Sequence, residues 1–255
     1  MTSEARPLVI AHRGASGLEP EHTEVAYRRA LADGADGFEC DVRLTRDRVL
    51  VCLHDRGVER TSNGRGVVSK MTLEELERLD FGKRRSGRPA TVLTLEALLG
   101  IALDAGRPLV VTIETKHPTA HAGEVERRLV ELLDHFGLAQ PDGRAGVTVR
   151  VMSFSPSALR SVRRQAPGLS TVALMSRLPR GAGTRPLFGG ATIAGPSLAA
   201  VKTDQGYVER AHARGEQVYV WTVDDPDDIS WLAELGVDAV ITNRPDIAAG
   251  RLGSG

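Results

Sequence analysis

The chain has 255 residues, and its 33 Lys and Arg balance its 33 Asp and Glu, so the formal net charge is zero. A neutral surface gives no general attraction for nucleic acid or anionic lipid, and we expect a small-molecule ligand held at a local site. No apolar run approaches the ~20 residues of a membrane helix. Residues 1–7 are polar and contain no apolar core of a secretory signal. We therefore expect a soluble cytoplasmic protein, with Cys40 and Cys52 as buried reduced thiols.

Short apolar runs alternate with amphipathic stretches along the chain. The predicted strands are 8–11, 36–42, 49–53, 109–113, 147–152, 170–175, 191–195, 217–222 and 238–242. The predicted helices are 23–33, 95–105, 121–136, 156–166, 203–214 and 226–235, with a capping box at Thr72 opening one further short helix. This alternation predicts a parallel sheet that is covered on both faces.

Nine strands are one more than an eight-stranded barrel holds. The connection between the strand ending near Val42 and the strand 49–53 is too short for a parallel crossover, which needs about a dozen residues. We therefore predict an antiparallel hairpin that turns near Asp47 and returns His54 to the level of Asp41.

The predicted fold class is α/β, a TIM (β/α)8 barrel with a hairpin after strand 2 and a small insertion. Residues 1–255 are expected to form a single domain, with 56–92 as the insertion. The Gly-, Pro- and Arg-rich stretch 176–190 is expected to be an irregular loop.

Acidic residues stand at the ends of two predicted strands. Glu39 and Asp41 are two apart and so share one face of their strand, and Glu114 follows the run 109–113. Barrel enzymes place their sites at the carboxyl ends of the strands, so we expect the three carboxylates to converge. Converging carboxylates repel one another unless a hard cation binds them. The sequence therefore predicts one divalent cation, Mg²⁺ or Ca²⁺, at this rim.

Histidines end two other predicted strands and would flank that cation. His12 follows 8–11, and His54 follows 49–53. Two histidines suit general acid and base roles near neutral pH. Arg13 and Lys116 add positive groups that suit phosphate: the guanidinium is a planar fork of donors, and the ammonium is a compact charge. The pattern favours chemistry on a phosphate ester.

Six short motifs carry a family resemblance in their order along the chain. They are His12-Arg13-Gly14, Glu39-x-Asp41-Val42, His54-Asp55, Glu114-x-Lys116, Ser153-Phe154 and Trp221-Thr222-Val223. Together they resemble the glycerophosphodiester phosphodiesterase family from His12 to about Pro245. The resemblance implies a TIM barrel, a divalent metal, and hydrolysis of glycerophosphodiesters to an alcohol and glycerol 3-phosphate.

The resemblance also implies roles for individual residues. The metal ligands would be Glu39, Asp41 and Glu114, the acid–base pair His12 and His54, the phosphate contacts Arg13 and Lys116, and the apolar wall of the substrate site Phe154 and Trp221. One departure concerns the family's Pro-Glu-Asn-Thr, which here reads Pro20-Glu21-His22-Thr23. Thr23 can still cap the following helix, but the sequence does not show whether His22 makes the polar contact that the resemblance attributes to that Asn.

Several alternatives stay open at the level of sequence. The nucleophile could be water or the substrate's own glycerol 2-hydroxyl, and either histidine could be the base. The head group, the ion and the oligomeric state are not determined. Rival functions are a lysophospholipase D-like or cyclising phosphodiesterase on a lipid, a non-catalytic phosphate-ester-binding barrel, and a metal-dependent sugar-phosphate isomerase. The complete set of two histidines and three carboxylates argues against the non-catalytic barrel, and the histidine pair with Lys116 fits phosphoryl chemistry better than isomerisation. The loop 176–190 contains one aromatic residue, Phe188, which argues against a lipid substrate.

Overall fold

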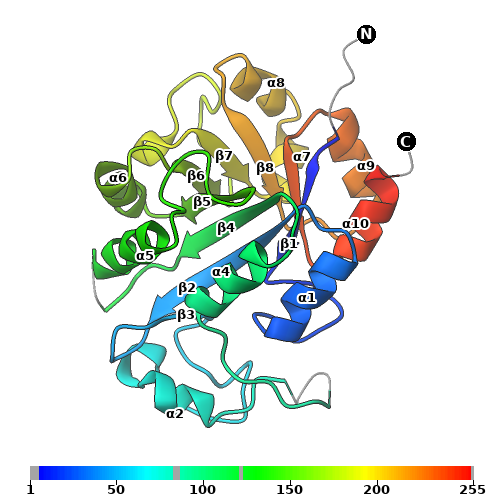
Figure 1. The fold of residues 1–255 in the computed structure, drawn as a ribbon. Helices are drawn as coiled ribbons and strands as arrows, with labels where there is room; N and C mark the ends of the chain where they lie inside the picture. Colours follow the sequence, from blue (N-terminus) through cyan, green and yellow to red (C-terminus); the bar gives the residue numbers. More distant parts are fainter. Residues whose placement is uncertain (1–5, 83–86, 121–122, 254–255) are drawn as a thin grey trace.

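The structure, a computed structural model, describes residues 6–82, 87–120 and 123–253 (Figure 1). Eight parallel strands form a closed barrel, because the outer strands β1 and β2 also pair with each other. The strands are β1 (Leu8–His12), β2 (Gly37–Leu44), β4 (Leu109–Thr115), β5 (Val147–Ser153), β6 (Ser170–Met175), β7 (Ile193–Pro196), β8 (Gln217–Trp221) and β9 (Ala239–Thr242). The predicted TIM barrel is confirmed.

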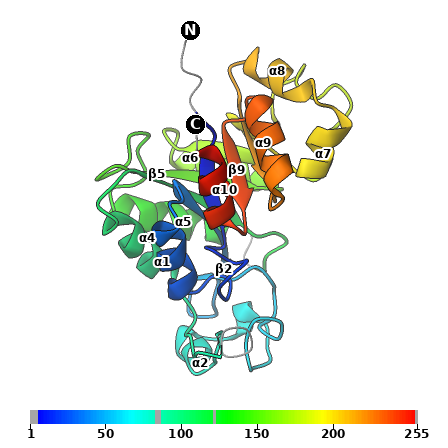
Figure 2. The same ribbon diagram turned by 90° about the vertical axis from the view of Figure 1, so that its right-hand side faces the viewer.

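Helices surround the strands on the outside of the barrel, as Figures 1 and 2 show. They are α1 (Glu24–Ala32), α4 (Leu95–Leu103), α5 (Glu124–His135), α6 (Pro156–Gln165), α7 (Leu198–Thr203), α8 (Tyr207–His212), α9 (Pro226–Glu234) and α10 (Pro245–Leu252). Thr23 caps α1 by accepting a hydrogen bond from the Ala26 amide, as the sequence predicted. Among the described residues, no helix has the length and apolarity needed to cross a membrane.

The predicted hairpin is confirmed. Strand β3 (Leu50–Cys52) runs antiparallel to the end of β2, with Val42 opposite Cys52. Beyond this pair the Leu53 amide donates to the Asp41 carbonyl at 3.0 Å, so His54 returns to the level of Asp41. Both cysteines of this region, Cys40 and Cys52, are buried and free.

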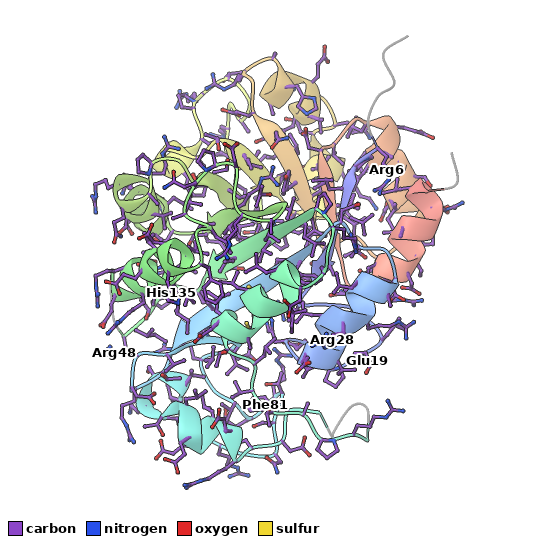
Figure 3. The ribbon with its side chains drawn as sticks, in the orientation of Figure 1. Arg6, Glu19, Arg28, Arg48, Phe81 and His135 are labelled. Atoms are coloured by element: carbon purple, nitrogen blue, oxygen red, sulfur yellow. The ribbon has the colours of Figure 1, made fainter. Side chains whose placement is uncertain are left out.

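The segment between β3 and α4 lies at the carboxyl end of β2, where Figure 2 shows it projecting from the barrel. It contains a 3-10 turn, η1 (Val68–Lys70), and α2 (Leu73–Glu77), which begins with the predicted capping box at Thr72. The segment has its own buried apolar cluster: Val51, Leu53, Val58, Val68, Leu76, Phe81 and Val92. Figure 3 labels Phe81 in it. Because Val51 and Leu53 belong to this cluster, the segment packs directly on the hairpin that carries His54.

The prediction of one helix over 203–214 is wrong. Helix α7 starts earlier, because Ser197 caps it by accepting from the Ala200 amide, and it ends at Thr203. Asp204 then takes a non-helical backbone conformation, and α8 begins at Tyr207. Helix α10 was not predicted. In the loop 176–190, only the short 3-10 turn η2 (Phe188–Gly190) is regular, in keeping with its expected irregularity.

Two glycine positions test the packing of the barrel in opposite directions. A Cβ on Gly37, at the start of β2, would lie 2.1 Å from the Val110 carbonyl oxygen, whereas a Cβ on Gly100, within α4, meets no atom within 4 Å apart from its chain neighbours and the nearby backbone of its own helix. We expect Gly37→Ala to lower the free energy of unfolding by about 1–3 kcal/mol through overpacking. Gly100→Ala should raise it by about 0.5–1 kcal/mol, because alanine favours the helix. Urea unfolding measures both, and equal midpoints for the two variants would contradict the packing described.

Candidate active site

The carboxyl ends of the strands surround one pocket of about 210 Å³. Its lining residues are His12, Arg13, Glu39, His54, Glu114, Lys116, Met152, Phe154, Leu174, Trp221, Thr222 and Ile241. Eight of the nine residues singled out in the sequence are in this lining, and the ninth, Asp41, lies buried beside it. The structure therefore brings together all the side chains that were predicted to share a site.

The register of the sheet explains why the carboxylates meet. Glu39 stands beside His12 in the pairing of β2 with β1, and Asp41 stands beside Glu114 in the pairing of β2 with β4. One oxygen from each of the three carboxylates lies within 4.8 Å of the others, and all three side chains are buried. The predicted convergence is confirmed as geometry.

Two cations lie against these carboxylates. Arg13 Nε is 3.0 Å from Asp41 Oδ2, and Lys116 Nζ is 3.3 Å from Asp41 Oδ1 and 2.9 Å from Glu114 Oε1. Despite its nearness to Lys116, the buried Asp41 Oδ1 accepts no well-oriented hydrogen bond from the described residues. The cluster thus contains an unsatisfied buried oxygen, which is costly without a further partner.

The pKa values reflect this balance of charge. Burial, helped by the negative charge of Asp41, raises the pKa of Glu39 well above its usual range and that of Glu114 to about 7. Burial also acts to raise the pKa of Asp41, but the hydrogen bond from His22 and the charges of Lys116 and Arg13 outweigh it and hold that pKa well below its usual range. Only an added cation would let all three ionise readily. The residues therefore fit a hard divalent cation, whose preferred ligands are carboxylate oxygens.

His22 makes the polar contact that the sequence left open. It is buried, with φ of 59°, a region that His and Asn enter more readily than most residues. Its Nε2 lies 2.9 Å from Asp41 Oδ2, and its Nδ1 lies 2.9 Å from the Tyr27 hydroxyl, which donates to the Glu39 carbonyl at 3.1 Å. His22 thus contacts Oδ2 of Asp41, whereas Lys116 lies against Oδ1.

His12 is oriented by a pair of residues that the sequence reasoning missed. Its Nδ1 lies 2.7 Å from Asn243 Oδ1, and the Asn243 amide nitrogen donates to Asp224 Oδ2 at 2.7 Å. The Asp224 carboxylate can only accept, so the NH₂ group of Asn243 faces Asp224 and its amide oxygen faces His12. The His12 Nδ1 must therefore donate to that oxygen. Nε2 is then the basic nitrogen, 3.9 Å from Glu39 Oε2. Burial and the charge of Arg13 lower the pKa of His12 to about 4, so the ring is neutral near pH 7.

One signal for Asn243 was present in the sequence, since it directly follows the predicted strand 238–242 at a carboxyl end.

The second histidine, His54, has a carboxylate where His12 has the Asn243 amide: its Nδ1 lies 2.6 Å from Asp55 Oδ1. Burial lowers the pKa of His54, although the charge of Asp41 and the hydrogen bond with Asp55 act in the opposite direction. Both histidines are therefore anchored through Nδ1.

A network of charges joins the two loops that carry these groups. Arg60 donates from Nη1 and Nη2 to the two oxygens of Glu21 at 2.6 and 2.7 Å, and from Nε to Asp55 Oδ2 at 2.5 Å. Glu21 Oε1 also accepts from Arg13 Nη1 at 3.1 Å. Burial opposes ionisation of Glu21 and Asp55, but Arg60 outweighs it, with Arg13 assisting at Glu21 and His54 at Asp55, and the pKa of each carboxyl is about 2.

The other half of the pocket is apolar. Phe154 follows β5 and Trp221 ends β8, and their rings meet edge to face with centroids 5.6 Å apart. Trp221 Nε1 donates to the Gly195 carbonyl at 2.7 Å, which fixes the indole. The Phe154 side chain is exposed, with 44% of the residue accessible. The pocket is therefore lined by charged side chains and by two aromatic rings.

A closed parallel barrel with such a pocket at the carboxyl ends of its strands has the architecture of a TIM-barrel enzyme. The model of the Glycerophosphoryl diester phosphodiesterase family matches residues 12–247. "Probable glycerophosphodiester phosphodiesterase 1" of Mycobacterium tuberculosis is 47% identical over 247 residues, covering 94% of this chain and 90% of that protein. A glycerophosphodiester phosphodiesterase of Caldanaerobacter subterraneus is 33% identical over 256 residues, covering 94% of this chain and 96% of that protein.

Among solved structures, an Oleispira antarctica phosphodiesterase in complex with the product sn-glycerol-3-phosphate is similar, with a TM-score of 0.87, 26% identity and 98% of each chain covered. The chain belongs to the glycerophosphoryl diester phosphodiesterase family. The resemblance found in the six sequence motifs is confirmed, and the chain is an enzyme of the phosphodiesterase class.

Glu21→Gln should change how stability responds to acid. The pKa of Glu21 is about 2 in the folded protein against an ordinary value of 4.5. A depressed folded pKa stabilises the protein above pH ~4.5, and this contribution is lost as the pH falls from ~4.5 to ~2. We expect the wild type to lose roughly 1–3 kcal/mol from this group over that window, and Glu21→Gln to lose correspondingly less. Urea unfolding at several pH values measures this, and parallel losses in both proteins would contradict it.

Proposed function

We propose that the protein hydrolyses glycerophosphodiesters to an alcohol and sn-glycerol 3-phosphate, with one divalent cation and a pair of histidines. The observation that carries this proposal is the pocket itself, in which three buried carboxylates, two histidines anchored through Nδ1 and an aromatic wall face one volume. Family membership and the product bound to the Oleispira antarctica relative support the substrate class. Residues 1–255 would act as one catalytic domain, with 56–92 as an insertion within it.

Glu39, Asp41 and Glu114 would hold the cation, Mg²⁺ or Ca²⁺. When bound, the cation would polarise the phosphate and offset the charge that develops in the transition state. Arg13 and Lys116 would bind the phosphate oxygens. Arg13 donates from Nη1 to Glu21, while its Nε lies 3.0 Å from Asp41 Oδ2 without a well-oriented hydrogen bond, so the guanidinium would have N–H groups to offer to a phosphate.

His12 would be the general base and His54 the general acid. His12 is neutral near pH 7, and its Nδ1–H is committed to Asn243, so the lone pair on Nε2 can take the proton of the nucleophile. The nucleophile is water or the substrate's own 2-hydroxyl, and either one can deliver its proton to the same nitrogen. His54 has the Asp55 carboxylate at Nδ1, which acts against the burial that lowers its pKa and directs Nε2 toward the pocket, where it would protonate the leaving alkoxide.

Phe154 and Trp221 would contact the carbon atoms of the glycerol or of the alcohol. A small diester fits the surface of the pocket better than a lipid does. Among the described residues, the large hydrophobic side chains with high exposure are Val25 and Phe154, and Val25 lies on α1 in the lining of a different hollow. Within the part of the chain that the structure describes, the barrel mouth therefore shows no broad apolar rim of the kind that inserts into lipid.

Removal of the metal should abolish activity. We expect a chelator to reduce turnover of glycerophosphocholine by ~10²-fold or more, and Mg²⁺ or Ca²⁺ to restore it, because metal assistance supplies several kcal/mol to such reactions. Asp41→Asn should also lose binding of the ion in a calorimetric titration, whereas Asp104→Asn, at the exposed end of α4, should not. Full turnover by a metal-stripped sample would contradict the proposal.

The histidines should affect turnover without affecting the fold. We expect His12→Ala and His54→Ala each to lower kcat by roughly 10²-fold or more, as the loss of a general acid or base does. Thermal unfolding should change little, since neither side chain belongs to an apolar cluster. His135→Ala, on the exposed face of α5, is the matched control. Near-normal kcat in either pocket variant would show that its assigned role is wrong.

A further inference from the structure

One charged residue outside the pocket contacts the partners of two pocket residues. Arg60 belongs to the segment between β3 and α4 and is absent from the pocket lining. It reaches Glu21, in the loop between β1 and α1, through two nitrogens, and Asp55, after β3, through a third. A guanidinium is suited to this arrangement, because its rigid fork binds one carboxylate with two nitrogens and leaves Nε for the other.

Each of these carboxylates has a second partner that lines the pocket. Asp55 uses Oδ2 for Arg60 and Oδ1 for His54 Nδ1, at 2.6 Å. Glu21 Oε1 receives both Arg60 Nη2 and Arg13 Nη1, at 2.7 and 3.1 Å. Arg60 is therefore separated by one residue, Asp55, from the proposed general acid, and by one residue, Glu21, from a proposed phosphate contact.

The fold itself has other means of holding this segment in place. Its apolar cluster includes Leu76 and Phe81, and backbone hydrogen bonds join it to the hairpin, from the Arg46 amide to the Met71 carbonyl and from the Cys52 amide to the Leu93 carbonyl. The Arg60 side chain is 48% exposed, and partly exposed ion pairs contribute little to global stability. A purely structural role would leave little reason for three short hydrogen bonds from one side chain.

We propose that Arg60 is a positioning residue for the reaction, which acts through Asp55 on His54 and through Glu21 on Arg13. With Arg60 present, the Asp55 carboxylate cannot rotate away from His54, and Glu21 keeps one oxygen directed at Arg13. Without it, Asp55 has one partner left and Glu21 loses its two-nitrogen contact. The segment between β3 and α4 is thereby part of the catalytic apparatus, although it supplies no side chain that touches the substrate. This inference rests on the proposed function for the roles of His54 and Arg13.

The test compares Arg60→Ala, Arg60→Lys and Arg65→Ala in the full chain with metal bound. Arg65 is an exposed arginine of the same segment and serves as the matched control. We expect Arg60→Ala to lower kcat for glycerophosphocholine by about 10- to 100-fold, because misplacement of catalytic groups by ~1 Å has effects of this order. Arg60→Lys should recover part of the loss, since an ammonium restores the charge but not the fork. Arg65→Ala should match the wild type.

Coupling to Asp55 distinguishes positioning from a general loss of structure. If Arg60 acts partly through Asp55, the double variant Arg60→Ala with Asp55→Asn should lose less kcat than the product of the two single losses, the remaining effect of Arg60 coming through Glu21. Multiplied losses would overturn this part of the proposal. Wild-type kcat and KM in Arg60→Ala would overturn it entirely, as would a collapse of the thermal midpoint that accounts for the lost activity.

A readout without substrate separates this inference from the proposed function. The proton on His54 Nδ1, in its 2.6 Å hydrogen bond to Asp55, should give a sharp downfield NMR resonance that His54→Ala removes. We expect Arg60→Ala to broaden or shift this resonance and Arg65→Ala to leave it in place. Failure of the wild type to hydrolyse any glycerophosphodiester would refute the proposed function, while an unchanged resonance in Arg60→Ala would refute the positioning role.

Discussion

The burial of three carboxylates at one rim of the barrel is the constraint on which the remaining site depends. Glu39, Asp41 and Glu114 point from β2 and β4 toward one another, and buried like charges are costly unless cations or hydrogen bonds compensate them. Arg13 and Lys116 supply part of the compensation and leave an unsatisfied oxygen on Asp41. The negative charge of the three carboxylates exceeds what these two side chains compensate, which gives a physical reason for a cation there. The same two positive side chains lie beside the place where the proposed phosphate would bind.

The barrel brings side chains that are far apart in the sequence close together in space. Parallel strands place His12, Glu39 and Glu114 at the same end, while the antiparallel hairpin is needed to bring His54 back to that end. Each histidine is then held through Nδ1 by a different kind of partner, an amide oxygen for His12 and a carboxylate for His54. This difference in partners makes the two rings chemically unequal, and the proposed mechanism assigns the base to His12 and the acid to His54 on that basis.

Residues at the ends of apolar runs could be predicted from the sequence, because a strand's carboxyl end fixes where its next side chain lies. The hairpin was also predictable, since the length of a connection excludes a parallel crossover. Contacts between loops were not predictable: Asn243 reaches His12 across 231 positions, and Arg60 reaches Glu21 across 39. The break between α7 and α8 depends on a local backbone conformation at Asp204 that hydrophobic periodicity does not record.

Diffraction from crystals soaked in Mn²⁺, with data collected at the manganese absorption edge, tests the central claim most directly. Mn²⁺ prefers the same oxygen ligands as Mg²⁺ and Ca²⁺. The charge balance of the cluster predicts one anomalous peak between Glu39, Asp41 and Glu114, with the carboxylate oxygens at about 2.0–2.6 Å from the ion. The absence of such a peak, with Lys116 Nζ still against Asp41 and Glu114, would show that the lysine alone compensates the carboxylates and would contradict a metal site at this rim.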